Sequence, residues 1–172
     1  MRYHPLDLMD ALDNMVLIVD TREQDTPRAR ARYKSFRRYE REKLDFGDYS
    51  AKIYLPDETV YSLADKAVIE RKMSLDELCQ CYTHDRERFE REFERAHEKG
   101  AKTYLLVENA TWEKVYSGAY RSKMRPTALV ASLLAWLCRY SCTVIFCKPE
   151  TTGSLIRDIL YREAKDRLEA ME

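Results

Sequence analysis

The chain has 172 residues, of which 45% are hydrophobic and 35% are charged. This composition is typical of one globular domain with a substantial core and excludes a disordered chain. Because 30 Lys and Arg residues balance 30 Asp and Glu residues, net charge does not indicate a generally basic, nucleic-acid-binding surface, and any phosphate binding must come from local patches.

The cysteines and the apolar segments indicate an intracellular protein. Five cysteines occur without a Cys-x-x-Cys pair, which argues against a disulfide framework and against a zinc site. The longest nearly apolar run, 128–138, has 11 residues, about half the length that a membrane-spanning helix needs. The first 14 residues lack the apolar core of a signal peptide. We therefore expect a cytoplasmic protein without a membrane partner or a small-molecule cofactor.

In chain order, a short helical lead-in is followed by the strands of one domain. A weak helical pattern covers residues 1–14, and the single domain covers residues 15–172. Alternating or continuous apolar residues predict four strands in the first half of the chain, the second and third of which form a hairpin. These strands cover residues 15–19, 49–55, 59–63 and 67–71.

A basic segment, residues 28–43, separates the first strand from the hairpin. It holds eight Arg or Lys and two Glu, and Tyr33, Phe36 and Tyr39 recur within it at intervals of three residues. An amphipathic helix over part of the segment fits this spacing. Two interpretations remain open from these residues alone: a solvated helix face anchored by its aromatic side chains, or a surface that contacts phosphates.

The second half of the chain alternates helices with strands. Ser74 followed by Glu77 forms a capping box that begins a helix, and Gly100 ends the next helix. The helix over 126–140 is apolar on almost every side, so we expect it to be buried on more than one face. The order of elements predicts an α/β fold with a mixed central β-sheet flanked by α-helices. Helices are predicted at 74–81, 83–100, 111–115, 126–140 and 153–171, and strands at 103–107 and 143–147.

Acidic side chains lie at the ends of four predicted strands: Asp20, Asp48, Glu70 and Glu108. In open α/β sheets, the ends of neighbouring strands meet at a crevice. Carboxylates that converge there repel one another unless a cation binds them. Oxygen ligands without Cys or His favour Mg²⁺, with Mn²⁺ as a substitute.

Glu70 and Lys72 are two residues apart, so an extended strand places both on one face and Arg71 on the other. A metal held by Glu70 and by a carboxylate from the Gly47-Asp48 turn would polarise a phosphodiester and lower the pKa of bound water. The lysine would orient or deprotonate the attacking water and offset developing charge. An ordinary strand that ends in solvated charges is the competing interpretation of this stretch.

The same residues resemble the signature of the XPF-type structure-specific endonucleases, a branch of the restriction-endonuclease-like superfamily. That signature is GD, a variable stretch, and then ERKxxxD. Here it is Gly47-Asp48, then Glu70-Arg71-Lys72, and then Asp76. Residues 19–23, Val-Asp-Thr-Arg-Glu, are similar to the family's VDxRE strand end, and the resemblance runs from about residue 17 to residue 160.

The resemblance implies a role for each matching residue. Asp48 and Glu70 would bind the metal, with Asp20 beside it, and the Arg71 carbonyl would complete the set. Asp76, in the first turn of a helix, would hold a site cation in place rather than act as a ligand. The implied catalytic residues are Lys72, Arg71, Glu70, Asp48, Asp20, Glu23 and Asp76, and the implied metal ligands are Asp48, Glu70 and Asp20. The basic segment and the loop 116–125 supply most of the predicted DNA contacts, which are Arg22, Arg37, Arg38, Arg86, Arg88, Arg121 and Lys123.

Two features depart from the family pattern. The gap between Asp48 and Glu70 is longer than usual, and residues 54–65 form an inserted hairpin that we expect to leave the two strand ends adjacent. The chain has neither the helix-hairpin-helix domain nor the helicase domain of larger members, so it resembles stand-alone bacterial and phage forms. Because family members dimerise through this domain, the resemblance also implies a homodimer through the 126–140 and 153–171 helices.

The resemblance therefore implies a Mg²⁺-dependent endodeoxyribonuclease. It would hydrolyse phosphodiester bonds in branched, flapped or duplex DNA during repair, recombination or phage DNA processing, in the cytoplasm of a bacterium or of a phage-infected host. One alternative is a non-catalytic DNA-binding or scaffold subunit that has kept the motif. The other is a nuclease that acts on RNA.

Overall fold

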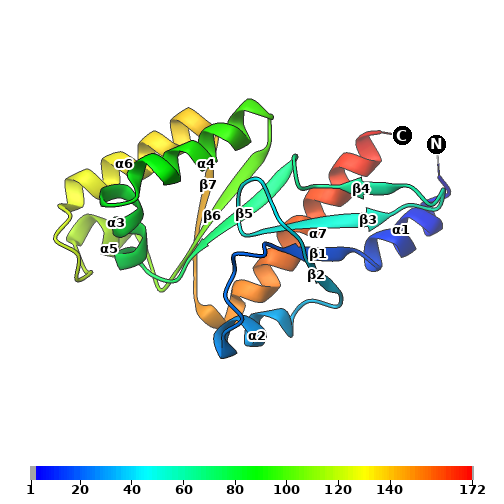
Figure 1. Cartoon of the computed structure of the whole chain (residues 1–172), viewed down its shortest axis with the longest axis horizontal. Helices are drawn as coiled ribbons and strands as arrows, with labels where there is room; N and C mark the ends of the chain where they lie inside the picture. The colour runs from blue at the N-terminus through cyan, green and yellow to red at the C-terminus, as the bar shows by residue number, and fades with distance from the viewer. Residues whose placement is uncertain (1–2, 172) are drawn as a thin grey trace.

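The structure, a computed structural model, describes residues 3–171, so residues 1, 2 and 172 of the predicted ranges lie outside it. It confirms the α/β fold with a mixed central sheet flanked by helices (Figure 1). The strands are β1 (Val16–Val19), β2 (Tyr39–Arg41), β3 (Tyr49–Tyr54), β4 (Val60–Ser62), β5 (Ala67–Lys72), β6 (Lys102–Glu108) and β7 (Thr143–Cys147). The helices are α1 (Pro5–Asp13), α2 (Pro27–Tyr33), α3 (Leu75–Thr83), α4 (Arg86–Glu98), α5 (Trp112–Ser117), α6 (Pro126–Tyr140) and α7 (Pro149–Ala170).

The sheet is mixed because its two halves run differently. The strand order is β2-β1-β3-β5-β6-β7, and β4 pairs with β3 outside this path. β1 is antiparallel to β3, whereas β5, β6 and β7 are parallel to one another. The parallel strands therefore end at the same edge of the sheet, and that edge carries the signature residues of β5.

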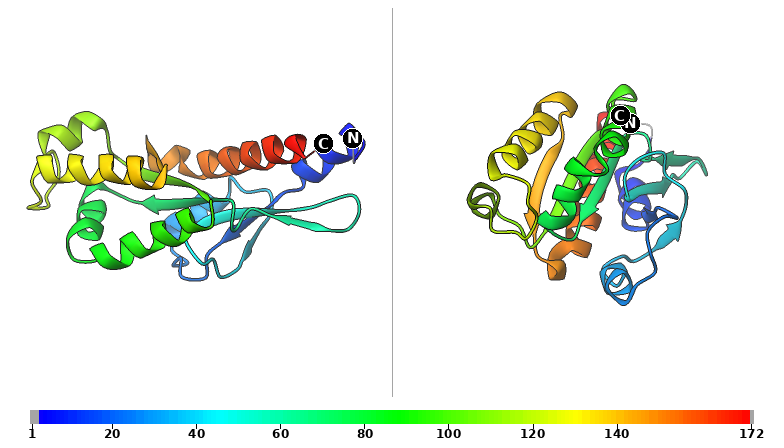
Figure 2. Two further views of the ribbon diagram at one scale, coloured as in Figure 1. Left: turned by 90° about the horizontal axis from the view of Figure 1, so that it is seen from above. Right: turned by 60° about the vertical axis from the view of Figure 1, so that its left-hand side comes forward.

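Two hydrophobic cores lie on opposite faces of the sheet. On β6, Leu106 points into the core formed with α1, α2 and α7, and its neighbours Leu105 and Val107 point into the core formed with α3, α4, α5 and α6. Figure 1 shows these two groups of helices towards opposite ends of the sheet, and Figure 2 shows α1 beside the C-terminal part of α7. Because alternate side chains of β6 enter the two cores, the sheet lies between two groups of helices.

The inserted hairpin leaves the signature segments adjacent, as predicted. The Asp48 N–H donates to the Ile69 carbonyl at 2.8 Å, and Tyr49 pairs with Ile69 across the two strands. Beyond this point β3 pairs with β4 instead of β5, so residues 54–65 project away from the β5 end. The long gap in sequence therefore does not separate Asp48 from Glu70 in space.

The basic segment 28–43 contains an element that the sequence did not predict. Its first part is helix α2, but residues 39–41 form β2, a parallel edge strand beside β1. All three residues of β2 are exposed, so the strand shows no apolar alternation in the sequence. Tyr33 and Phe36 are buried with their ring centroids 5.6 Å apart, so these two aromatic residues anchor the segment, whereas Tyr39 in β2 is 44% exposed.

Helix α6 has the predicted bounds, but within one chain it is buried on one side only. Leu129, Leu133 and Trp136 are fully buried, whereas Leu134 is 43% exposed. The expectation of burial on more than one face is therefore wrong for the single chain. Over residues 3–171, no helix combines the length and the apolar character that crossing a membrane requires.

Candidate active site

The glycine of the GD pair permits the closest approach between the two signature segments. Gly47 has a φ of 75°, which favours glycine, and a Cβ at this position would lie 2.9 Å from the Val68 Cβ. The next residue, Asp48, is thereby placed against the end of β5, where its Oδ2 accepts a hydrogen bond from the Arg71 N–H at 2.8 Å. Backbone bonding therefore fixes one oxygen of Asp48 at the strand end.

Glu70 and Lys72 lie on one face of β5, as their spacing predicts. Lys72 Nζ donates to Glu70 Oε1 at 2.6 Å, and it lies 5.2 Å from the centroid of the Phe89 ring on α4. Both side chains are largely buried, with 12% and 9% of their surfaces exposed. They line a cavity of about 240 Å³ that is also lined by Arg22, Asp48, Cys81, Arg88, Phe89 and Glu92.

Burial and mutual repulsion perturb the charges in this cavity. Burial raises the pKa of Asp48, and the neighbouring Glu70 raises it further. Burial also raises the pKa of Glu70, although Lys72 opposes the effect. For Lys72 the effect of burial is outweighed by Glu70 and Asp48, which raise its pKa, so the lysine is charged at neutral pH. Two carboxylates that destabilise one another in this way favour the binding of a further cation.

The donor set fits a hard divalent cation that keeps part of its water shell. Over the described residues 3–171, no three His, Cys, Asp or Glu side chains are arranged to hold a metal by themselves. Mg²⁺ is commonly held by only one or two carboxylates, together with water and substrate phosphates. Asp48 and Glu70 supply these two carboxylates, so the predicted ligands Asp48 and Glu70 are brought together.

The third predicted ligand, Asp20, lies outside the lining of this cavity. Both of its oxygens are engaged within the chain: Oδ1 accepts from Arg22 Nε at 2.7 Å, and Oδ2 accepts from the Leu44 N–H at 2.7 Å. Burial raises the pKa of Asp20, but these hydrogen bonds outweigh it and hold the pKa below its usual value. Asp20 therefore braces Arg22 and the turn before Gly47, and its predicted place beside a metal stays a prediction.

Glu23 is held near the site by a buried tyrosine. Tyr49 OH donates to Glu23 Oε2 at 2.7 Å, and Arg32 Nε donates to the same hydroxyl at 3.2 Å. Glu23 also contributes to the raised pKa of Asp48, after burial and Glu70. The structure therefore brings Glu23 towards Asp48 through Tyr49 and Arg32, neither of which the sequence singled out.

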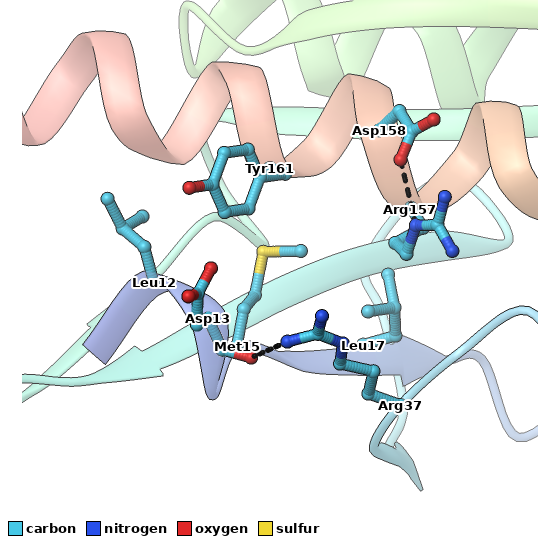
Figure 3. A pocket seen from close by; sticks show the side chains of 8 residues that line it. All are labelled: Leu12, Asp13, Met15, Leu17, Arg37, Arg157, Asp158 and Tyr161. Carbon is cyan, nitrogen blue, oxygen red and sulfur yellow. Dashed lines mark hydrogen bonds and ion pairs between the residues drawn. The ribbon is translucent and has the colours of Figure 1, made fainter. Parts of the chain in front are cut away.

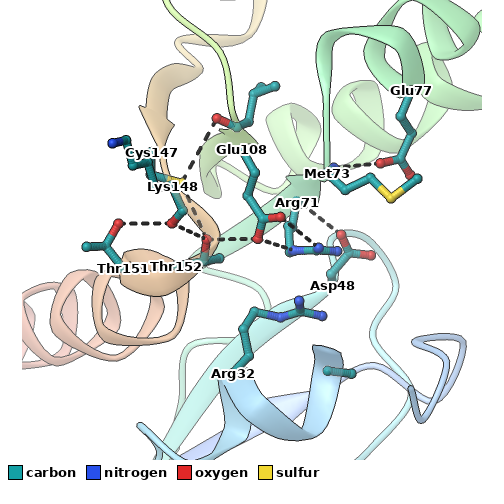
Figure 4. A network of polar contacts seen from close by, with 12 residues as sticks. Arg32, Asp48, Arg71, Met73, Glu77, Glu108, Cys147, Lys148, Thr151 and Thr152 are labelled. Atoms are coloured by element: carbon teal, nitrogen blue, oxygen red, sulfur yellow. Dashed lines mark hydrogen bonds and ion pairs between the residues drawn. The ribbon is translucent and has the colours of Figure 1, made fainter. Parts of the chain in front are cut away.

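Arg71 and Glu108 form a separate pair on the opposite face of β5. Arg71 Nε and Nη2 donate to the two oxygens of Glu108 at 2.9 and 3.1 Å, and Thr152 Oγ1 donates to Glu108 Oε1 at 2.8 Å (Figure 4). The predicted meeting of Glu108 with the other carboxylates is therefore wrong, because alternation along β5 and β6 turns Glu108 towards Arg71. The pair stabilises the end of β5 on the face opposite Glu70 and Lys72.

Asp76 holds a loop from a distant part of the sequence. Its Oδ1 accepts hydrogen bonds from the Arg121 and Ser122 N–H groups, both at 2.8 Å, and its Oδ2 lies 3.5 Å from Arg121 Nε. The helix that carries Asp76 begins at the predicted cap, in which Ser74 Oγ accepts from the Glu77 N–H. The Glu77 carboxylate accepts from the Met73 N–H rather than from the Ser74 N–H. Asp76 thus connects the ERKxxxD segment to the basic loop 116–125.

The predicted DNA contacts divide into those around the cavity and those elsewhere. Arg22 and Arg88 line the cavity that holds Glu70, and Arg121 lines an adjoining hollow together with Lys72 and Asp76. Arg37, in contrast, lines a pocket with Leu12 and Met15 before the start of β1, away from the strand end (Figure 3).

The remaining three predicted contacts also differ in their surroundings. The Arg86 guanidinium lies 5.4 Å from the Trp136 ring centroid, so Arg86 contributes to the packing of α4 against α6. Arg38 and Lys123 are exposed. Of the seven predicted DNA contacts, Arg22, Arg88 and Arg121 are therefore the ones that lie beside the carboxylates.

Several residues of the site carry no signal that sequence reasoning alone detects. Arg32 is one of six arginines in the basic segment, and only its burial distinguishes it from the others. Glu92 belongs to a helix whose apolar stripe and charged faces are typical of any surface helix. Tyr49 is the exception: it directly follows the Gly47-Asp48 pair at the start of a predicted strand, so its position in the sequence indicates a place near the site.

Comparison with known proteins agrees with this geometry. The model of the family described as the ERCC4 domain matches residues 19–159. The structure of XPF from Aeropyrum pernix is similar, with a TM-score of 0.60 and 20% identity over 84% of this chain and 59% of that chain. XPF from Aeropyrum pernix in complex with DNA gives a TM-score of 0.60 and 21% identity over 88% of this chain and 66% of that chain.

These comparisons establish the fold as restriction-endonuclease-like, the fold of XPF. The alignments span about three fifths and about two thirds of the two XPF chains. Among curated protein sequences, none matches the chain.

Proposed function

The chain belongs to the ERCC4 domain family, and from this membership we propose that it is a metal-dependent DNA endonuclease. It hydrolyses phosphodiester bonds in branched, flapped or duplex DNA, in repair, recombination or phage DNA processing. The observation that carries the proposal is the convergence of Asp48, Glu70 and Lys72 on one cavity at the end of β5. Similarity to XPF, including XPF in complex with DNA, supports DNA as the substrate.

In the proposed reaction, Asp48 and Glu70 would hold Mg²⁺, for which Mn²⁺ could substitute. The metal supplies Lewis acidity towards the phosphodiester and lowers the pKa of bound water. Lys72, whose Nζ lies 2.6 Å from Glu70 Oε1 in the same cavity, would donate a hydrogen bond to a phosphate oxygen and offset the negative charge that develops there.

Three arginines around the cavity bind the DNA backbone in this proposal. Arg22, Arg88 and Arg121 have exposed side chains beside the carboxylates. Arginine donates in a fork that matches phosphate geometry. Contacts of this kind position the strand without reading its sequence, so the enzyme recognises the shape of its substrate.

We also propose that the protein forms a homodimer through α6 and α7. Leu134 is 43% exposed on α6, where Ala131 and Cys138 are exposed as well. An apolar helix face of this kind is typical of a surface that a partner covers. Most of the apolar residues of α7 pack against the sheet of the same chain, so α6 supplies the larger apolar part of the interface.

The test is cleavage of matched single-stranded, duplex, flap and four-way DNA, with and without Mg²⁺. We expect Mg²⁺-dependent cutting of at least one substrate and its loss in Lys72→Ala. Lys99→Ala is the matched control, because Lys99 is half exposed and pairs with Asp45 away from the cavity. Equal cutting by Lys72→Ala and the parent protein, or no Mg²⁺-dependent cutting of any substrate, would show that the proposal is wrong. Cleavage that requires a 2′-hydroxyl would identify an RNA nuclease instead.

A further inference from the structure

A second cavity, of about 380 Å³, lies on the Arg71 face of β5, opposite Glu70 and Lys72. It lies where α2, the β5 end and the start of α7 meet. Its walls carry three arginines, Arg28, Arg32 and Arg71, against two carboxylates, Glu108 and Glu150. Glu108 pairs with Arg71, and Arg32 lies 3.5 Å from Glu23, so Arg28 is the arginine of the lining that faces only Glu150.

Two guanidinium groups, that of the buried Arg32 and that of the largely buried Arg71, have hydrogen-bond donors to spare. Arg32 is 7% exposed; its Nε donates to Tyr49 OH, and its Nη2 lies 3.5 Å from Glu23 Oε2. Arg71 uses Nε and Nη2 on Glu108. Since a guanidinium carries five N–H donors, each arginine retains further donors beside the cavity. Figure 4 shows the two guanidinium groups pointing towards the same space.

Helix α7 begins at this cavity and adds a second set of donors. It is 22 residues long, begins with Pro149, and its N-cap Lys148 makes no side-chain capping bond to the described residues. The first-turn N–H groups of a long helix favour an anion. Here Pro149 has no N–H and the Thr151 N–H donates to the Lys148 carbonyl, so only the remaining first-turn N–H groups face an anion. Gly153 permits this arrangement, because a Cβ there would lie 2.5 Å from the Arg32 carbonyl oxygen. α2 can therefore approach α7 closely enough to place Arg32 in the wall.

Arg71 joins this cavity to the candidate active site. Its N–H donates to Asp48 on the carboxylate side, and its guanidinium lines the second cavity. The two cavities therefore adjoin the same end of β5, one on each face of the strand. Phosphate oxygens accept several hydrogen bonds at once, and arginine forks are suited to donate them.

We propose that this second cavity binds a phosphate group of the DNA strand beside the bond that is cut. The proposal rests on the proposed function for the identity of the strand, and on the arginines and the α7 start for the phosphate. The phosphate is either a backbone diester or a 5′-terminal monoester, since both present the same oxygens. Arg28, exposed at the edge of the cavity, attracts the strand, and the buried Arg32 and the largely buried Arg71 orient the phosphate.

The test measures binding without cleavage. A short single-stranded oligonucleotide labelled at its 3′ end, with or without a 5′ phosphate, is titrated with the full chain in EDTA at several salt concentrations. We expect Arg28→Gln to weaken binding and to reduce the slope of log K against log salt by about 0.7, the value for one phosphate on a single strand. Arg32→Lys keeps the charge and removes the fork, so we expect weaker binding with a smaller change in slope. Inorganic phosphate competes with the oligonucleotide in the parent protein and less in both variants.

Arg30→Gln is the matched control, because Arg30 is exposed on the same helix and pairs with Asp25 outside the cavity. If Arg28→Gln and Arg32→Lys bind with the affinity and slope of Arg30→Gln, the proposal is wrong. Loss confined to the 5′-phosphorylated oligonucleotide identifies the terminal phosphate, and equal loss with both identifies a backbone phosphate. If Arg32→Lys does not fold, as judged by circular dichroism, Arg28→Gln decides alone. Failure of the proposed function shows separately, as absence of Mg²⁺-dependent cutting by the parent protein.

Discussion

Substitution of Asp76 tests whether this signature residue acts by holding the loop 116–125 or by holding a cation. Its Oδ1 accepts two N–H hydrogen bonds at 2.8 Å, from Arg121 and Ser122. A hydrogen bond to a charged group contributes about 1.5–3 kcal/mol when buried. The Asp76 side chain is 32% exposed, so solvent reduces this, and we assign about 1 kcal/mol to each bond.

The two bonds together therefore stabilise the ordered loop by about 2 kcal/mol, which is a factor of about 30 in its population relative to an open loop. Asp76→Asn keeps an acceptor oxygen without the charge, so we expect loss of about half this free energy. Asp76→Ala removes both bonds. The Arg121 and Ser122 amides should then exchange with solvent about five times faster in Asp76→Asn and about 30 times faster in Asp76→Ala, if loop opening limits exchange.

The matched assays are amide hydrogen exchange and cleavage at varied Mg²⁺. We expect both variants to raise KM, because the loop that carries Arg121 is less ordered, while the Mg²⁺ concentration for half-maximal activity stays unchanged. Glu87→Gln, at an exposed position of α4, serves as the control. A shift of the Mg²⁺ requirement with unchanged exchange at Arg121 and Ser122 would refute the reasoning and assign Asp76 to the cation.

Three further predictions concern stability and assembly. Gly47→Ala should lower the free energy of unfolding in urea by about 2–4 kcal/mol, because an alanine Cβ would lie 2.9 Å from the Val68 Cβ at a φ of 75°. Gly100→Ala is the control: its Cβ would have no described atom within 4 Å, so it should lower the free energy of unfolding by only about 1 kcal/mol. Burial raises the pKa of Glu163, but hydrogen bonds from Lys102, Tyr104 and Arg167 outweigh burial and hold the pKa below its usual value. The charged form of Glu163 therefore stabilises the folded state above pH 4.5, and this contribution is lost as the pH falls through the folded pKa. Glu163→Gln should therefore lower stability by about 1–3 kcal/mol at pH 7 and by much less in acid, with the exposed Glu169→Gln as the control, and an equal loss at both pH values would contradict the assignment. Leu134→Arg should convert the proposed homodimer to a monomer, as measured by analytical ultracentrifugation. Leu6→Arg, at an exposed position of α1, is the control and should leave the dimer intact. A dimer that survives Leu134→Arg would place the interface elsewhere.

Local chemistry made most of the elements and the heart of the site predictable from the sequence. The alternation along β5 predicted that Glu70 and Lys72 share a face and that Arg71 does not. The Ser74–Glu77 capping box predicted the start of α3, because a cap depends on residues only three positions apart. The GD and ERKxxxD pairs also predicted the meeting of Asp48 with Glu70, in spite of the inserted hairpin.

Contacts between distant segments were decided only by the tertiary structure. β2 is an exposed, charged edge strand, and pairing with β1 rather than its own composition makes it a strand. Helix α7 begins at Pro149, before the predicted position 153, and Thr152 near its start donates a hydrogen bond to Glu108. β2 has no local sequence signal that distinguishes it from a loop, whereas Pro149 followed by Glu150 is a helix-start signal that the prediction of a start at 153 did not use.

The roles of single side chains divide in the same way. The sequence by itself determined which residue types are available at the strand ends, since strand periodicity and the signature are properties of neighbouring residues. Only the tertiary structure decided their partners: Glu108 pairs with Arg71 through the β5–β6 register, Asp20 with Arg22 and Leu44, and Asp76 with a loop 45 residues away. The physical reason is that a buried charge is stabilised by the nearest opposite charge or hydrogen-bond donor. Which group is nearest depends on how the whole chain packs.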